Sequence, residues 1–122
     1  MVLSMIEQRI ADILRTVAKK QKVIAYSELN QRVPLNLDLS LPPDRNLLSH
    51  WLGRILRYET EQGHPALPAV ALYKGSTDPG PGFFIVVDDL GLRNPSEDDD
   101  AVHMRLLNAV YAYYKTNKSA TP

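Results

Sequence analysis

The chain of 122 residues contains no cysteine. This absence excludes disulfides, thiolate metal sites, haem attachment through a C-x-x-C-H segment and a thiol nucleophile. A domain of this size without disulfides is typical of a reducing compartment. The start of the chain shows no signal-peptide pattern, and no run approaches the roughly 20 apolar residues that a membrane span requires. We therefore expect a cytoplasmic protein with no membrane partner.

Net charge is also lacking, because 14 Lys and Arg residues balance 14 Asp and Glu residues. Residues 1–60 hold nine basic and six acidic side chains, whereas residues 61–122 hold five and eight. A dedicated nucleic-acid-binding domain is usually clearly basic, so this balance weighs against one. The rest of the composition is ordinary for a globular protein, with 44% hydrophobic and 23% charged residues. We expect one domain over residues 1–117 and a frayed tail over residues 118–122.

Apolar residues that recur every three to four positions predict four helices. A capping box formed by Ser4 and Glu7 opens the first helix, and Gly63 closes the third. Gly53, in the middle of the third helix, either lets another backbone approach or is tolerated at a cost of about 1 kcal/mol. The predicted helices run from Ser4 to the lysines at 19–22, from Ser27 to about Arg32, from Asp44 to about Gln62, and from Ser96 to about Lys115.

Two apolar runs predict a β-hairpin. They cover residues 66–73 and 83–87, and the segment between them is dense in glycine and proline. A short strand-like run lies at residues 23–26, and residues 35–43 alternate apolar and polar side chains as an extended connector would. The element order is helix, short strand, helix, long helix, hairpin, helix. This order predicts an α+β, winged-helix-like fold with three N-terminal helices, a β-hairpin and a C-terminal helix.

Basic side chains on the predicted third helix, over residues 44–62, form the candidate binding site. His50, Arg54 and Arg57 fall at i, i+4 and i+7 and share one face, with Arg45 and Ser49 nearby. In a winged helix this element would meet phosphates and guanine edges of DNA. The alternative is a solvated face whose arginines pair with carboxylates or cover apolar surface with their stems. If both arginines are exposed, replacing them by alanine should cost little folding free energy.

The predicted hairpin adds only one basic side chain, Lys74, and the nearby Asp78 works against binding of DNA. Its glycines lack the spacing of a phosphate-binding loop. The three histidines show no metal-binding spacing, and no nucleophile motif is present. We therefore predict no catalytic residue, no metal and no cofactor.

Four segments of the chain resemble a little-characterised family of small bacterial proteins. Proteins of that family share a characteristic helix start, a characteristic strand entry and a Pro-Gly-x-Gly-Phe-Phe turn. The resemblance spans most of residues 6–114 and implies a winged-helix-like fold but no activity. The segments are residues 23–29 (VIAYSEL), 52–56 (LGRIL), 63–72 (GHPALPAVAL) and 79–84 (PGPGFF).

The element order and the segment from Tyr26 to Leu29 are also similar, more distantly, to the DNA-binding domain of alkylguanine alkyltransferases and alkyltransferase-like proteins. Those proteins carry Pro-Cys-His-Arg or Pro-Trp-His-Arg where this chain has Pro65-Ala-Leu-Pro68. The acceptor cysteine, its histidine partner and the arginine are absent here. The resemblance therefore implies no alkyl transfer, and only DNA contact through the third helix carries over as an expectation.

Three classes of function are consistent with these observations. The first is a non-enzymatic module that contacts DNA, and its predicted contacts are Arg45, Ser49, His50, Arg54, Arg57 and Lys74. The second is a protein-interaction module or homodimer with no nucleic-acid role, which predicts a sizeable apolar surface. The third is an enzyme whose pocket no motif reveals.

Overall fold

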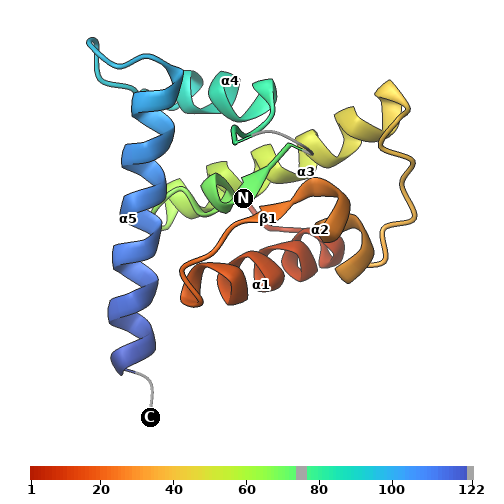
Figure 1. Cartoon of the computed structure of the whole chain (residues 1–122), viewed down its shortest axis with the longest axis horizontal. Coiled ribbons are helices and arrows are strands. Elements are labelled where there is room, and N and C mark those ends of the chain that lie inside the picture. Colours follow the sequence, from red (N-terminus) through yellow and green to blue (C-terminus); the bar gives the residue numbers. More distant parts are fainter. Residues whose placement is uncertain (74–76, 121–122) are drawn as a thin grey trace.

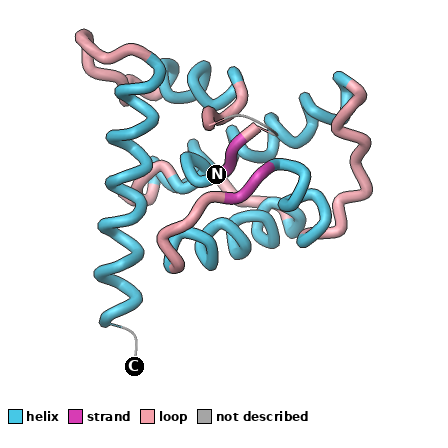
Figure 2. Tube along the Cα trace, in the orientation of Figure 1, coloured by secondary structure: helices cyan, strands magenta, loops and turns pink. Residues whose placement is uncertain are grey.

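The computed structural model of the protein describes residues 1–73 and 77–120, with side chains up to Lys115 (Figure 1). Helices make up most of the described chain, and two very short strands make up the sheet (Figure 2). In chain order the elements are α1 (Met5–Lys19), β1 (Ile24–Ala25), α2 (Tyr26–Arg32), α3 (Pro42–Glu61), the 3-10 helix η1 (Leu67–Val70), β2 (Ala71–Leu72), α4 (Pro81–Asp89) and α5 (Asp99–Ala120).

The predicted winged-helix fold is wrong, because the β-hairpin does not form. Half of its first strand, residues 66–73, is the 3-10 helix η1, and β2 is only two residues long. Its second strand, residues 83–87, lies inside the helix α4. A short apolar run fits a buried helix as well as a strand. Here Pro81 at the start of α4 has the fixed φ of a first helical residue, which favours the helix.

The sheet that does form joins β1 to β2 in parallel. Ile24 lies opposite Ala71, and Ala25 lies opposite Leu72. Parallel strands need a crossover connection, and α2 and α3 lie within it. The pairing places the residues that follow each strand next to one another, so the rings of Tyr26 and Tyr73 meet edge to face with centroids 5.9 Å apart.

The core lies where α1, α3 and α5 surround η1 (Figure 1). Leu67, Ala69 and Val70 of η1 are completely buried. α5 crosses one end of this group and packs on α1 and η1, while α4 packs on α3. Within residues 1–73 and 77–120, no helix combines the length and the apolar character needed to cross a membrane.

The predicted signals at two helix ends are confirmed. The Ser4 hydroxyl accepts a hydrogen bond from the Glu7 N–H at 3.2 Å, and the Ser4 N–H donates to the Glu7 carboxylate at 2.7 Å. Gly63, just after α3, has a φ of 73°, the left-handed conformation that favours glycine.

Three other predicted helix starts are displaced. α2 has Ala25 at its N-cap position instead of Ser27, and α3 has Leu41 there instead of Asp44. Prolines at the start of α3 preset the helical φ, so the helix begins before the expected cap. α5 begins at Asp99 and not after Ser96, and it continues through Ala120.

Arginines hold the loop between α4 and α5. The guanidinium of Arg93 lies 2.8 Å from the Asp88 carboxylate and 2.7 Å from that of Asp99. Arg105 of α5 lies 2.7 Å from Glu97 in the loop. The hydrogen bond from Arg105, with a further one from a backbone N–H, lowers the pKa of Glu97 to about 2.

Close packing of α3 on α4 explains the glycine in the middle of α3. A Cβ at Gly53 would lie 3.2 Å from a methyl carbon of Val86. One turn earlier, Ser49 of α3 faces Gly82 of α4, where a Cβ would collide with the serine hydroxyl. The two helices thus run side by side in the same direction, and Gly53 permits the approach.

Replacing Gly53 by valine should destabilise the protein by about 1–3 kcal/mol, because the added carbons overpack the contact between α3 and α4. Shortening Val86 to alanine in the same chain should recover part of this loss. Urea unfolding of the two single variants and the double variant measures the coupling. Valine at the exposed Asn108 of α5 is the control for a β-branched residue in a helix. Strict additivity of the two changes would show that the contact is absent.

Candidate functional site

Of the three residues predicted to share one face of the third helix, which we call the stripe (His50, Arg54 and Arg57), Arg54 is turned towards α1. Its Nε lies 2.6 Å from the Glu7 carboxylate, and its Nη2 donates to the carbonyl oxygen of Val2 at 3.0 Å. Glu7 is only 1% exposed. Burial by itself would raise the pKa of Glu7, but hydrogen bonds from Ser4 and Arg54 outweigh it and leave that pKa below its ordinary value. Arg54 is therefore the counter-ion of a buried carboxylate.

The remaining stripe residues do not converge on one surface. Arg57 pairs with Asp89 of α4 at 2.9 Å, in an ion pair that is partly exposed. Ser49 faces α4, while His50 is exposed. Lys74 lies outside the described residues. Two of the predicted contacts do line a cavity with other polar side chains: Arg45 lines both of the open cavities described below, and Ser49 lines one of them.

A second buried carboxylate, Glu59 of α3, mirrors Glu7. It is completely buried, and its two oxygens lie 3.6 Å from Arg15 of α1 and 2.8 Å from the ring of His64. Its Oε1 has no hydrogen-bond partner among the described residues. Each of α1 and α3 thus gives one buried carboxylate and one arginine to the other helix. These charges are used inside the fold.

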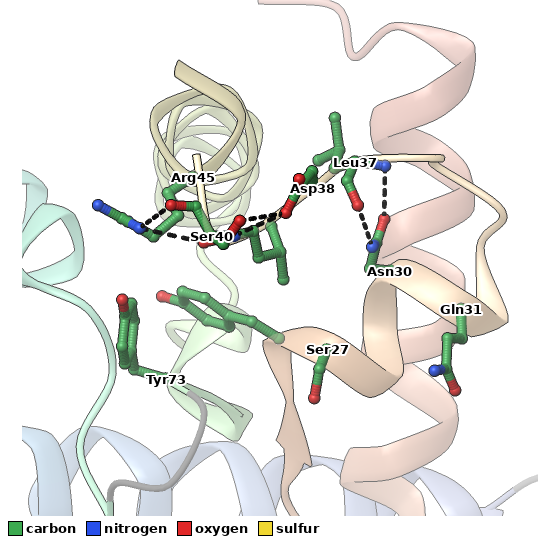
Figure 3. Close-up of a pocket in the computed structure, with 10 residues that line it drawn as sticks. Ser27, Asn30, Gln31, Leu37, Asp38, Ser40, Arg45 and Tyr73 are labelled. Carbon is green, nitrogen blue, oxygen red and sulfur yellow. Dashed lines mark hydrogen bonds between the residues drawn. The ribbon is translucent and has the colours of Figure 1, made fainter. Parts of the chain in front are cut away.

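The candidate site is a groove made of two cavities that the sequence did not reveal. The first, of about 640 Å³, lies between α2 and the connector to α3 (Figure 3). The second, of about 680 Å³, lies between the start of α3 and the loop that leads into α4. Both are open to solvent, and both are lined by Tyr26, Arg45 and Tyr73. We call the two cavities together the tyrosine groove.

Side-chain hydrogen bonds hold the connector that forms one wall of the groove. The Asn30 amide donates to the Leu37 carbonyl at 2.8 Å and accepts from the Leu37 N–H at 3.1 Å (Figure 3). Asp38 accepts bonds from the hydroxyl and N–H of Ser40 at 2.6 and 3.0 Å. These bonds, the hydroxyl first, lower the pKa of Asp38. Arg45 donates from Nη1 to the carbonyl oxygens of residues 39 and 40, both at 3.1 Å.

Tyr26 forms the floor of the groove where the two cavities meet. It is 8% exposed, and its hydroxyl accepts a hydrogen bond from the Gly80 N–H at 3.1 Å. Burial raises the pKa of Tyr26, so the phenol stays neutral. A Cβ at Gly80 would lie 3.1 Å from that hydroxyl oxygen, and therefore glycine lets the loop approach the ring. Tyr73 rises beside it and is 39% exposed.

One acidic residue contributes to the lining of the second cavity. Asp78 lines that cavity, and its carboxyl lies close to Asp100 of α5. The charge of Asp78, joined by burial and by Asp98, raises the pKa of Asp100. Within the described residues, no group of three or more His, Cys, Asp or Glu side chains is placed to hold a metal ion.

The two stripe arginines should differ sharply when each is replaced by alanine. Arg54→Ala leaves Glu7 buried and unpaired, at a cost of about 3 kcal/mol, the low end for a broken buried pair because the arginine is 35% exposed. Arg57→Ala breaks a partly exposed pair and should cost below about 1 kcal/mol. Urea denaturation at neutral pH measures both values. Equal costs would contradict the assigned roles.

Acid should destabilise the protein as the pH falls from about 4.5 towards 2. The pKa values of Glu7, Asp38 and Glu97 are lowered in the folded protein, so the unfolded chain binds protons first. The stabilisation that these three carboxylates contribute is complete above their pKa values in the unfolded chain. It is lost as the pH falls through their pKa values in the folded protein. Asp100, with its raised pKa, works in the opposite direction. Unfolding free energies at stepwise pH test this, with Glu97→Gln expected to flatten the curve. A flat wild-type curve would refute it.

Comparison of the chain with protein-family models, with curated proteins and with solved structures found no match. The resemblance to the small bacterial family therefore stays a prediction, and its winged-helix-like fold is replaced by the helical one described above.

Proposed function

We propose that the protein is a non-enzymatic binding module that holds an extended segment of a partner protein in the tyrosine groove. The observation that carries this proposal is the meeting of two open cavities at Tyr26, Arg45 and Tyr73. Each cavity lies within the range of about 300–1,000 Å³ that is usual for a ligand site. One elongated ligand would lie across the three residues that line both cavities.

The lining suits a polypeptide. Tyrosine combines a large apolar ring with a polar tip and is enriched in protein interfaces. Leu37 and Leu39 are half-buried beside the rings, and Asn46 and Ser49 add polar groups from α3. A segment bound here meets both apolar and hydrogen-bonding side chains.

The groove is also preorganised. The bonds of Asn30 to Leu37, of Ser40 to Asp38 and of Arg45 to the connector already hold its wall. Binding of a partner therefore costs little conformational entropy in this wall of the groove. Among the described residues, no histidine lines either cavity, so the groove offers no imidazole for acid–base catalysis.

DNA contact through α3 is the alternative function. The exposure of His50 and the partial exposure of Arg57 favour it. The ion pairs of Arg54 with Glu7 and of Arg57 with Asp89 weigh against it, because both arginines already face carboxylates. Titration of mixed-sequence duplex DNA at low and near-physiological salt separates the two functions, since DNA binding to phosphates weakens steeply with salt.

Peptides selected from a displayed library of random 12-residue sequences should bind the tyrosine groove. We expect Tyr73→Ala to weaken binding of the selected peptides at least tenfold, because it removes the exposed ring at the junction of the cavities. Fluorescence polarisation with synthetic labelled peptides measures the dissociation constants. Met104→Ala, an exposed apolar residue on α5, is the matched control and should change nothing.

Two outcomes would overturn the proposal. One is peptide binding that is equal in the wild-type protein and the Tyr73→Ala variant. The other is failure to select any peptide, combined with micromolar DNA binding that falls steeply with salt. Circular dichroism must show that both variants remain folded.

A further inference from the structure

Arg45 differs from most arginines of this protein. Within residues 1–73 and 77–120, it and Arg9 are the two arginines without a carboxylate partner, and of these two Arg45 lines the tyrosine groove. The other arginines all form ion pairs, and they are Arg15, Arg32, Arg54, Arg57, Arg93 and Arg105.

The guanidinium of Arg45 is held in a defined orientation. Its Nη1 donates to the carbonyl oxygens of Leu39 and Ser40, both at 3.1 Å (Figure 3). Both bonds are made by Nη1, so the edge of the guanidinium formed by Nε and Nη2 is left for a ligand. That edge matches the two oxygens of a carboxylate. Because the connector already orients the side chain, a ligand gains this contact with little further loss of rotamer freedom.

The surroundings of Arg45 favour a singly charged anion over a doubly charged one. The start of α4, at Gly80 to Gly82, lines the same cavity and has no side-chain cap, so the positive pole of this helix lies beside the groove. Asp38 and Asp78 line the groove on either side of Arg45. These two carboxylates would repel a doubly charged phosphate more than a carboxylate. Recognition of phosphorylated peptides also relies on clusters of arginines, whereas the described lining of the groove contains a single arginine, Arg45.

We propose that the segment bound in the tyrosine groove carries an aspartate or glutamate whose side chain pairs with Arg45. This inference rests on the proposed function and adds to it the chemistry of the partner. The acidic side chain lies at the junction of the two cavities, and the residues before and after it occupy one cavity each. Asp38 and Asp78 then face the flanking residues of the partner, where they disfavour further acidic side chains.

A double-mutant cycle between peptide and protein tests the pair. Peptides selected on the wild-type protein are resynthesised with each Glu changed to Gln or each Asp to Asn. We expect one such change to weaken binding to the wild-type protein at least tenfold. With the Arg45→Gln variant the same change should have no effect, because the charge it served is gone. Arg45→Lys, which keeps the charge but loses the fork, should recover only part of the affinity.

Arg9→Gln is the matched control, since Arg9 also lacks a carboxylate partner but lies outside the groove; it should leave every affinity unchanged. Thermal unfolding by circular dichroism shows that each variant is folded. If peptides depend on Tyr73 but contain no acidic residue, or are insensitive to its replacement, the Arg45 inference is refuted while the proposed function stands. If no selected peptide depends on Tyr73, the proposed function itself fails.

Discussion

Two buried carboxylates, on Glu7 and Glu59, constrain how the rest of the chain can pack. A buried charge without a partner costs several kcal/mol, so each glutamate must meet a cation. α1 contributes Glu7 and Arg15, and α3 contributes the matching Arg54 together with Glu59. These reciprocal pairs are formed only when the two helices cross at one position. These pairs therefore fix the register of the two helices against which η1 packs.

This constraint also decides which part of α3 is left for function. The middle of the helix faces α1 through Arg54 and faces α4 through Gly53 and Arg57. The arginines in the middle of α3 are therefore paired with carboxylates of neighbouring helices. The N-terminal end of α3 extends beyond these contacts (Figure 1). There Arg45 donates hydrogen bonds to the connector and lines the groove. The proposed binding surface lies at the end of the helix because the centre of the helix contacts α1 and α4.

The short parallel sheet has a role larger than its size. Its two residue pairs bring the ends of β1 and β2 together, and the tyrosines that follow each strand meet as a result. The hydroxyl of Tyr26 then accepts a bond from Gly80, which sets the loop before α4 against the groove. A few hydrogen bonds between distant segments thus join α2, the connector, α3 and α4 into one concave surface.

The sequence by itself determined the local features of this protein. The capping box of Ser4 and Glu7 and the helix stop at Gly63 depend on neighbours within a few positions, and both predictions are confirmed. The predicted hairpin failed because five apolar residues fit a strand and a buried helix equally well, and Pro81 together with packing against α3 selects the helix α4. The partners of Arg54 and Arg57, 47 and 32 positions away, leave no trace in helical spacing. The tyrosine groove draws on four separate segments, so the tertiary structure alone decided it, because proximity in space between distant residues follows from packing and not from sequence order.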